Sequence, residues 1–111
     1  MEVLHFGINA KNAADAEEIS KVFGTMFDFV ANNGNSSIFT ADKKIEIVKE
    51  NGRGKHGHIC LGTHDIEKDI AALESKGLVF DEASAKFKNE KLASIYIKEE
   101  IAGFAVHLMS Y

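Results

Sequence analysis

The residues best able to carry chemistry gather near the middle of the chain. His56 and His58 form a His-x-His pair, and on a strand such a pair places both imidazoles on one face, where they could chelate a metal ion. Gly57 separates His56 from the apolar run that follows, so a loop position is favoured for His56. The segment Arg53–Gly57 alternates cations with glycines, a pattern able to wrap a phosphate or carboxylate. It lacks the signature of a nucleotide-binding loop, and a flexible crossover between two halves is the preferred interpretation.

The cysteine, the serines and the phenylalanines favour structural roles rather than catalytic ones. Cys60 lies in an apolar run with no neighbouring base or helix N-terminus, which favours a buried, inert thiol. No serine has the Gly-x-Ser-x-Gly context of a hydrolase nucleophile. The eight phenylalanines fall mostly at inward spacing and predict a core, with Phe6 and Phe104 expected to line a cleft.

Composition sets the class of protein. The chain has 111 residues, is 45% hydrophobic and 27% charged, and carries a formal charge of -4, which favours one globular domain and gives no basic surface for nucleic acid. No apolar run approaches the ~18 residues that span a bilayer, and the N-terminus has no secretion signal. A single cysteine fits a reducing compartment, so we expect a cytoplasmic domain that handles a small molecule.

The first half of the chain predicts a β-α-β-β-β order. A helix over residues 12–26 is indicated by Asn12 as its N-cap and by apolar residues at helical spacing. The predicted strands around it are Val3–Ala10, Asp28–Ala31, Ser36–Thr40 and Lys44–Lys49.

The second half predicts the same order. Asp65 is expected to cap a helix, and Gly77 to be the left-handed residue that ends it. The predicted strands are His58–Gly62, Leu78–Phe80, Leu92–Lys98 and Phe104–Met109.

An internal repeat supports this division. A shift of 53 positions aligns His5 with His58, and it aligns four further pairs expected at element boundaries: Asn12 with Asp65, Gly24 with Gly77, Phe27 with Phe80 and Asp28 with Asp81. We therefore expect one domain over residues 1–111, built from a module 1–52 and a module 53–111. Two sheets facing each other would enclose a cleft lined by inward side chains.

Paired modules with a histidine on each opening strand resemble the vicinal oxygen chelate superfamily, which includes glyoxalase I, extradiol dioxygenases, methylmalonyl-CoA epimerase and the bleomycin-resistance proteins. The resemblance covers essentially the whole chain. It implies an α+β fold of two tandem βαβββ modules that form a curved, cleft-bearing mixed sheet. The runs NSSIF, GKHGHI and IKEEIAGFAVHL also resemble a glyoxalase-like domain at the C-terminal end of some bacterial keto-deoxy-phosphogluconate aldolases. The chain would then be a stand-alone relative of that domain or a part of a longer protein.

The resemblance implies a metal site. The positions that match the superfamily's ligands are His5, Glu46, His58 and His107, and His107 stands where a glutamate is usual. Such a set suits Zn²⁺, Ni²⁺, Mn²⁺ or Fe²⁺, with no nucleotide cofactor. Glu46 is also expected to act as the catalytic proton shuttle. An alternative is that the histidines are half-buried strand residues with no ligand role.

Two functions follow as expectations. The first is a metal-dependent lyase or isomerase of the glyoxalase type, acting on an α-keto or α-hydroxy acid or a similar vicinal-oxygen compound. The second is a non-catalytic ligand-binding or dimerisation module associated with an aldolase; short loops that leave little room for a lid favour this alternative. In either case Arg53, Lys55, His56, Phe6 and Phe104 are the expected ligand-binding residues. Sequestration of a toxic aromatic compound is disfavoured by the absence of tryptophan. A homodimer through exposed sheet edges is the expected assembly.

Overall fold

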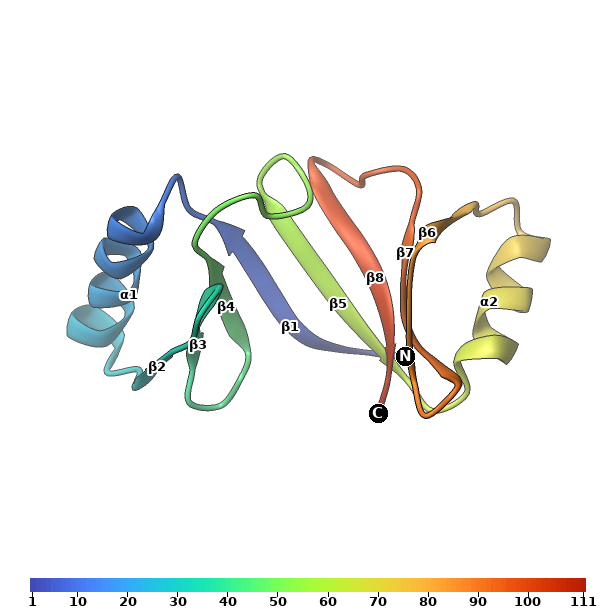
Figure 1. Ribbon diagram of the computed structural model, residues 1–111, viewed down its shortest axis with the longest axis horizontal. Coiled ribbons are helices and arrows are strands. Elements are labelled where there is room, and N and C mark those ends of the chain that lie inside the picture. Colours follow the sequence, from blue (N-terminus) through green and yellow to red (C-terminus); the bar gives the residue numbers. More distant parts are fainter.

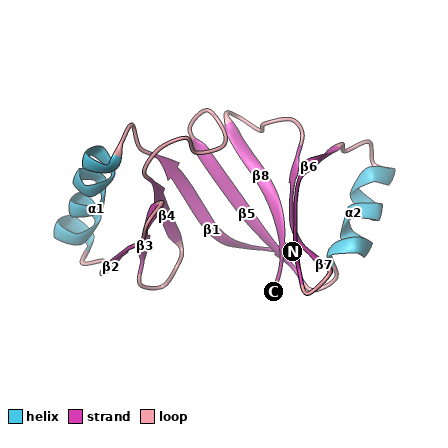
Figure 2. Ribbon diagram, viewed as in Figure 1, coloured by secondary structure: helices cyan, strands magenta, loops and turns pink.

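The computed structural model describes residues 1–111 and contains two βαβββ modules in tandem (Figures 1 and 2). The first module consists of β1 (Glu2–Asn9), α1 (Ala13–Phe27), β2 (Ala31–Asn33), β3 (Ser37–Thr40) and β4 (Ile45–Val48). The second consists of β5 (Gly57–Thr63), α2 (Ile66–Ser75), β6 (Phe80–Lys88), β7 (Lys91–Ile97) and β8 (Phe104–Ser110). The predicted α+β class and module order are confirmed.

The eight strands form one continuous curved sheet in the order β2-β3-β4-β1-β5-β8-β7-β6 (Figure 1). The predicted curved, mixed sheet is confirmed, and the two module sheets do not only face each other, because they join through an antiparallel β1–β5 pair. The sheet is mixed, since β1 runs parallel to β4 and β5 runs parallel to β8. Each module thus follows the same spatial order outward from the centre, which gives the sheet an approximate two-fold axis between β1 and β5.

Both helices lie on one face of the sheet, where two apolar cores form. Helix α1 packs on β3 and β4, and α2 packs on β7 and β8. The buried core residues are Ala10, Ala16, Ile38 and Ile47 in the first module, and Ile66, Phe80, Ile95, Ile97, Val106 and Leu108 in the second. Because side chains alternate along a strand, this arrangement sends the intervening residues to the opposite face, which we call the inner face.

The helix caps confirm two sequence predictions and correct a third. Asn12 accepts a hydrogen bond from the Asp15 backbone N–H at 2.8 Å, and Asp65 accepts one from Lys68 at 3.2 Å. Gly24, however, lies inside α1, and the left-handed residue that ends this helix is Asp28, with a φ of 60°. The alignment of Gly24 with Gly77 is therefore wrong, since α1 has 15 residues and α2 has 10.

Two strands differ from their predicted positions. Strand β2 occupies Ala31–Asn33 rather than Asp28–Ala31, because the α1 cap takes up the residues before it. Strand β6 extends over Phe80–Lys88, well beyond the predicted Leu78–Phe80. It pairs only with β7 and is mostly exposed and polar, so it lacks the apolar alternation by which strands are recognised in a sequence. Neither helix is long and apolar enough to cross a membrane.

Candidate metal centre

Strand register gathers candidate side chains into two rows on the inner face. In the first row, His5 on β1 lies opposite Cys60 on β5, and Cys60 lies beside His107 on β8. His107 in turn lies opposite Tyr96 on β7. Three donor side chains from three neighbouring strands therefore lie side by side.

The second row of side chains crosses β4, β1 and β5. Glu46 on β4 lies beside Gly7 on β1, and Gly7 lies opposite His58 on β5. Gly7 has no side chain, so Glu46 and His58 can reach across it toward each other. The two rows together bring all four predicted metal ligands to one place.

The closest contacts join three of these ligands. The Nε2 atoms of His5 and His58 are 3.1 Å apart. The Oε1 atom of Glu46 lies 3.1 Å from His58 Nε2 and 3.5 Å from His5 Nε2. Two imidazole nitrogens and a carboxylate oxygen thus converge on one point, as the ligands of a divalent ion do.

Glu46 is held in its ionised form. The Ser37 hydroxyl donates a hydrogen bond of 2.8 Å to Glu46 Oε2, which leaves Oε1 for the histidines. Burial acts to raise the pKa of Glu46, but the hydrogen bonds from His58 and Ser37 and the charges of His58 and His5 outweigh it. The pKa of Glu46 is therefore below its usual value, and the carboxylate is available at neutral pH as a ligand or a base.

Three candidate ligands have a shifted pKa: His5, Glu46 and His107. His107 is the most deeply buried of the three. Its side chain stacks on Tyr96 with ring centroids 4.6 Å apart, and its ring lies 5.8 Å from that of His5 and 5.5 Å from that of His58. Burial, together with the nearby histidines, lowers the pKa of His107 to about 4. It is therefore neutral under physiological conditions, which is the protonation state that binds metal ions.

The donor set fits a divalent metal ion. His107 Nε2 is buried with no hydrogen-bond partner, which is a costly state for a polar atom that an ion would relieve. Burial and the neighbouring His58 also lower the pKa of His5, which favours the neutral form of that imidazole. Three imidazoles and one carboxylate suit the borderline ions Zn²⁺, Ni²⁺, Mn²⁺ and Fe²⁺.

Two glycines permit the close packing at this centre. A Cβ atom added to Gly7 would lie 2.0 Å from the ring of His58, so only glycine allows the His58 imidazole to lie against β1. A Cβ on Gly57 would meet the backbone oxygen of Gly7 at 1.9 Å. Sequence reasoning did not identify Gly7, and no local motif signals it, because the constraint comes from a neighbouring strand.

The crossover between the modules is held by Asn9. Its side-chain amide donates to the backbone oxygens of Gly52, Arg53 and Gly54, the last at 2.8 Å. This polar clamp gives the segment a defined path, whereas the sequence favoured a flexible connection. A side chain at Gly54 would collide with Gly57 and β8, so the segment packs closely against the sheet.

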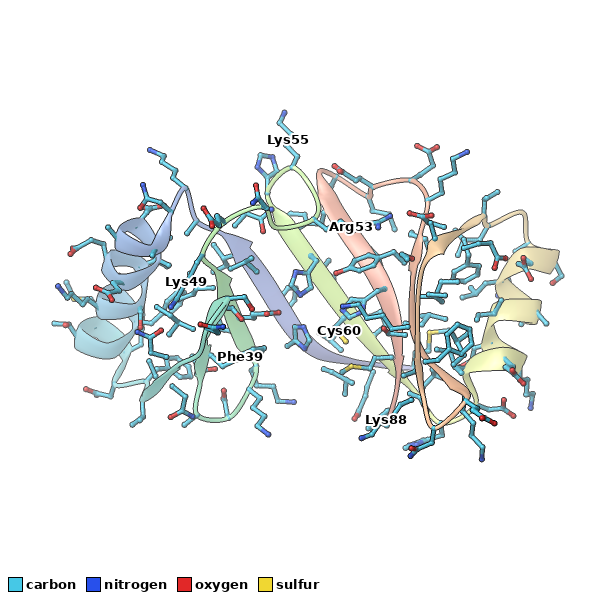
Figure 3. All side chains as sticks on the ribbon, in the orientation of Figure 1. Phe39, Lys49, Arg53, Lys55, Cys60 and Lys88 are labelled. Carbon is cyan, nitrogen blue, oxygen red and sulfur yellow. The ribbon has the colours of Figure 1, made fainter.

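The three cations of this segment diverge. Arg53 folds back over the ring of Tyr96, with Cζ 4.3 Å from the ring centroid, and forms a 2.8 Å ion pair with Asp81. Lys55 points away from the sheet at the tip of the loop (Figure 3). His56 lies outside β5, as predicted, and its ring packs near Phe104 at 5.9 Å between centroids. Only Arg53 connects to the candidate centre, through the stack of Tyr96 on His107.

Phe6 and Phe104 do not accompany the candidate ligands. Phe6 lies opposite Ile45 and Ile59, on the face that bears the helices. Phe104 alternates with His107 in the same sense as Val106 and Leu108, which are core residues beneath α2. The aromatic residue that does face the centre from the first module is Phe39, 6.0 Å from the ring of His5 (Figure 3).

A cavity adjoins the centre on the side of Phe39. It measures about 430 Å³ and is lined by Asn32, Asn33, Gly34, Phe39 and Lys43. Asn32 lies opposite Phe39 in the β2–β3 pair, so the cavity lies on the inner face of the first module. Its lining offers two amides and one cation beside an aromatic ring.

Cys60 is buried, as predicted, and has no exposed surface. Burial raises the pKa of its thiol to about 11, with the Glu46 charge adding to the effect. The sequence did not indicate that its neighbours across the sheet are His5 and His107.

No protein-family profile matches the sequence, and no curated protein matches it. Among solved structures, a methylmalonyl-CoA epimerase aligns with 100% of this chain and 95% of its own, at 13% identity and a TM-score of 0.68. A hypothetical protein from Bacillus halodurans gives the same TM-score of 0.68 at 13% identity, with coverage of 99% and 94%.

Two further solved structures are similar to this chain. A methylmalonyl-CoA epimerase from Streptomyces coelicolor, in complex with 2-nitronate-propionyl-CoA, has a TM-score of 0.64 at 12% identity, covering 99% of this chain and 96% of that one. A glyoxalase/bleomycin resistance protein/dioxygenase superfamily member from Vibrio splendidus has a TM-score of 0.55 at 8% identity and covers 96% of this chain and 95% of its own. The paired modules, the continuous curved sheet and these similarities agree: the chain has the vicinal oxygen chelate fold.

Proposed function

We propose that this chain is a metal-dependent domain of the glyoxalase type that moves a proton at a carbon next to a carbonyl group. Its substrate class is a small α-keto or α-hydroxy acid, or a similar compound with vicinal oxygens. The observation that carries the proposal is the convergence of His5 Nε2, His58 Nε2 and Glu46 Oε1 within 3.1 to 3.5 Å of one another.

His5, His58 and His107 would hold a divalent ion, with Glu46 beside them as a fourth ligand or as a free base. When bound, the ion supplies Lewis acidity that polarises adjacent substrate oxygens and acidifies the neighbouring C–H bond. The protein shields two of these ligands from solvent, since His58 and His107 are 5% and 8% exposed.

Glu46 is the proposed proton acceptor. Its lowered pKa keeps it ionised, and the Ser37 hydroxyl fixes Oε2 so that Oε1 faces the centre. Glu46 Oε1 would take the proton from the substrate carbon, while the C–H electron pair forms a carbon–carbon double bond and the carbonyl π pair moves onto oxygen to give an enolate. Return of the proton to either carbon or either face completes an isomerisation or epimerisation.

The surroundings favour an anionic substrate. Lys43 and the amides of Asn32 and Asn33 line the cavity on one side of the centre, and Arg53 lies above Tyr96 on the other side. Asp81 engages one terminal nitrogen of Arg53, so other guanidinium donors remain for a carboxylate or phosphate. Epimerases with this fold have been solved with a CoA-linked nitronate, and an acyl thioester is a second substrate type for the same proton transfer.

Elemental analysis of the purified chain and solvent exchange test the proposal together. We expect about one equivalent of a transition metal, and incorporation of deuterium from D₂O at the C–H carbon next to the carbonyl group in a panel of α-keto acids, hemithioacetals and methylmalonyl-CoA. Glu46→Gln should retain the metal and lose about 10²- to 10⁴-fold in exchange rate. Glu50→Gln, an exposed acidic residue outside the site, is the matched control and should exchange at the wild-type rate.

Full activity of Glu46→Gln with metal bound would contradict the base role. Absence of metal after soaking in Zn²⁺, Ni²⁺ and Mn²⁺ would contradict the metal centre and favour the alternative, a non-catalytic binding module associated with a keto-deoxy-phosphogluconate aldolase. The triple variant His5→Ala, His58→Ala, His107→Ala controls for metal bound elsewhere.

The proposed assembly is a homodimer through a sheet edge. Of the two edges, β2 carries only Ala31, Asn32 and Asn33, whereas β6 carries charged residues such as Lys86 and Lys88 that protect an edge from pairing. Light scattering after size-exclusion chromatography tests it: Asn33→Lys should convert a dimer to a monomer, and Lys88→Glu should not.

A further inference from the structure

Cys60 lies between two histidines in the first row of the inner face. Its register partners are His5 on β1 and His107 on β8, so the thiol has an imidazole on each side. The thiol sulfur and one nitrogen from each ring lie within 4.8 Å of one another. In the other module the equivalent place is occupied by Gly7, so the sulfur is present on one side of the centre only.

His107 gives independent evidence that an ion binds at this row. Its side chain is more than nine-tenths buried, and its Nε2 atom has no hydrogen-bond partner. A buried nitrogen without a partner lacks the compensation that nearly all buried polar atoms have. One ring nitrogen of His107 lies within 4.8 Å of donor atoms of Cys60 and His5, so a metal ion bound between them is within reach of this imidazole.

We propose that His5, Cys60 and His107 form a second, sulfur-containing metal site within this centre, selective for thiophilic ions such as Cd²⁺, Zn²⁺ and Cu⁺. Thiolate and imidazole together suit these ions, whereas the His5–Glu46–His58 set suits ions that accept oxygen, such as Mn²⁺. A zinc ion with sulfur at about 2.3 Å and nitrogens at about 2.1 Å needs donors about 3.5 Å apart, so side-chain shifts of about 1 Å complete the site.

The two sets share His5, so one ion occupies the centre at a time and its chemistry decides which set is used. The inference goes beyond the proposed function, in which Cys60 has no part, but it shares His5 and His107 with that site. Binding at the sulfur set places the ion away from Glu46 and His58 and releases the thiol proton to solvent. A thiophilic ion would then occupy the centre without Glu46 among its ligands.

Co²⁺ is the probe that separates the two sets. It is titrated into the metal-free, full-length protein under anaerobic conditions with a non-thiol reductant, and the near-ultraviolet spectrum is recorded. We expect a sulfur-to-cobalt charge-transfer band in the wild type. Cys60→Ser should abolish the band and weaken Cd²⁺ binding at least about tenfold, while changing Mn²⁺ affinity by less than about twofold. His58→Ala should retain the band and lose Mn²⁺ binding.

The outcomes distinguish this inference from the proposed function. Co²⁺ bound with d–d absorption but no sulfur band in the wild type would overturn the sulfur set and leave the His and Glu centre standing. A sulfur band in a protein that fails the deuterium-exchange test would support the sulfur set and count against the proton-transfer function. No bound Co²⁺, Cd²⁺ or Mn²⁺ would overturn both. The wild-type spectrum decides the point even if a variant fails to fold.

Discussion

Glu46 and His107 occupy equivalent positions in the two modules. Glu46 lies beside Gly7 in the parallel β1–β4 pair, and His107 lies beside Cys60 in the parallel β5–β8 pair. Gly7 and Cys60 are themselves 53 positions apart, the offset of the internal repeat. The four candidate ligands are therefore two pairs related by the approximate two-fold axis. One pair is a matched pair of histidines, and the other combines a carboxylate with an imidazole, so the centre contains a single carboxylate.

The close contact of Gly7 with His58 predicts a position-specific loss of metal binding. Gly7→Ala places a methyl group where the His58 ring lies, and the ring must move away from His5 and Glu46. Because affinity depends on ligand placement, we expect at least about a tenfold loss in Mn²⁺ affinity, measured by competition with a chromogenic chelator.

Gly24→Ala is the matched control for this substitution. Gly24 lies inside α1, and an added Cβ would meet only the Phe29 backbone oxygen at an ordinary 3.4 Å. Alanine in a helix is more stable than glycine by up to about 1 kcal/mol, so the control should bind Mn²⁺ normally and unfold at equal or higher urea concentration. Equal Mn²⁺ affinity in both variants would show that the His58 position does not limit binding.

The repeat found in the sequence predicts only two of the four candidate ligands, His5 and His58. The offset of 53 aligns His5 with His58 because each opens a module, and the caps Asn12 and Asp65 follow at the same distance. Glu46 and His107 are 61 positions apart, since the longer β6 and its turns add residues to the second module. A fixed offset cannot follow such an insertion, and only resemblance to a known superfamily pointed to this second pair.

Contacts across strands account for what the sequence could not predict. An apolar run predicts that its residues are buried, as it did for the thiol of Cys60. Which residues become neighbours depends on register, which is fixed by pairing between segments far apart in the chain. The placement of His107 beside Cys60, and the need for glycine at Gly7, follow from register alone.

Ser37 is predicted to be a positioning residue for Glu46. Its hydroxyl stabilises the charged carboxylate, so Ser37→Ala should raise the pKa of Glu46, as measured by ¹³C NMR titration of the side-chain carboxyl in the metal-free protein. The lost charge-assisted hydrogen bond should lower the free energy of unfolding by roughly 1–3 kcal/mol. Ser94 is the two-fold equivalent of Ser37 on β7, and Ser94→Ala should leave the Glu46 titration unchanged. A shift of equal size in both variants would contradict the positioning role.

Arg53 is predicted to recognise anions without contributing much to stability. Its ion pair with Asp81 is about one-third exposed on each side, so Arg53→Gln should lower the free energy of unfolding by less than about 1 kcal/mol. The same variant should weaken binding of oxalate to the Zn²⁺-loaded protein about tenfold, measured by calorimetry, because one charged hydrogen bond is worth about that factor. Lys55→Gln, at the outward-pointing loop tip, should bind oxalate like the wild type. Equal affinities in all three proteins would show that Arg53 serves only its contacts with Tyr96 and Asp81.

The buried His107 makes the metal-free protein sensitive to acid. In the unfolded chain this imidazole takes up a proton near pH 6.5, whereas burial lowers its pKa in the native protein to about 4. Between these values the unfolded state binds more protons, so the free energy of unfolding is highest above pH 6.5 and decreases as the pH falls toward 4. The full difference corresponds to roughly 3 kcal/mol. The lowered pKa of His5 acts in the same direction, while the carboxylate of Glu46 loses its stabilising effect only at still lower pH, below its ordinary value of 4.5.

Urea unfolding of the metal-free protein across this pH range measures the effect. His107→Gln removes the titrating group, so its free energy of unfolding should change less with pH than that of the wild type. His64→Gln replaces an exposed histidine outside the centre and should keep the wild-type pH dependence. Saturating Zn²⁺ should raise the stability of the wild type most at high pH, because ion and proton compete for the same Nε2 atom. An unchanged pH dependence in His107→Gln would show that acid acts on another group.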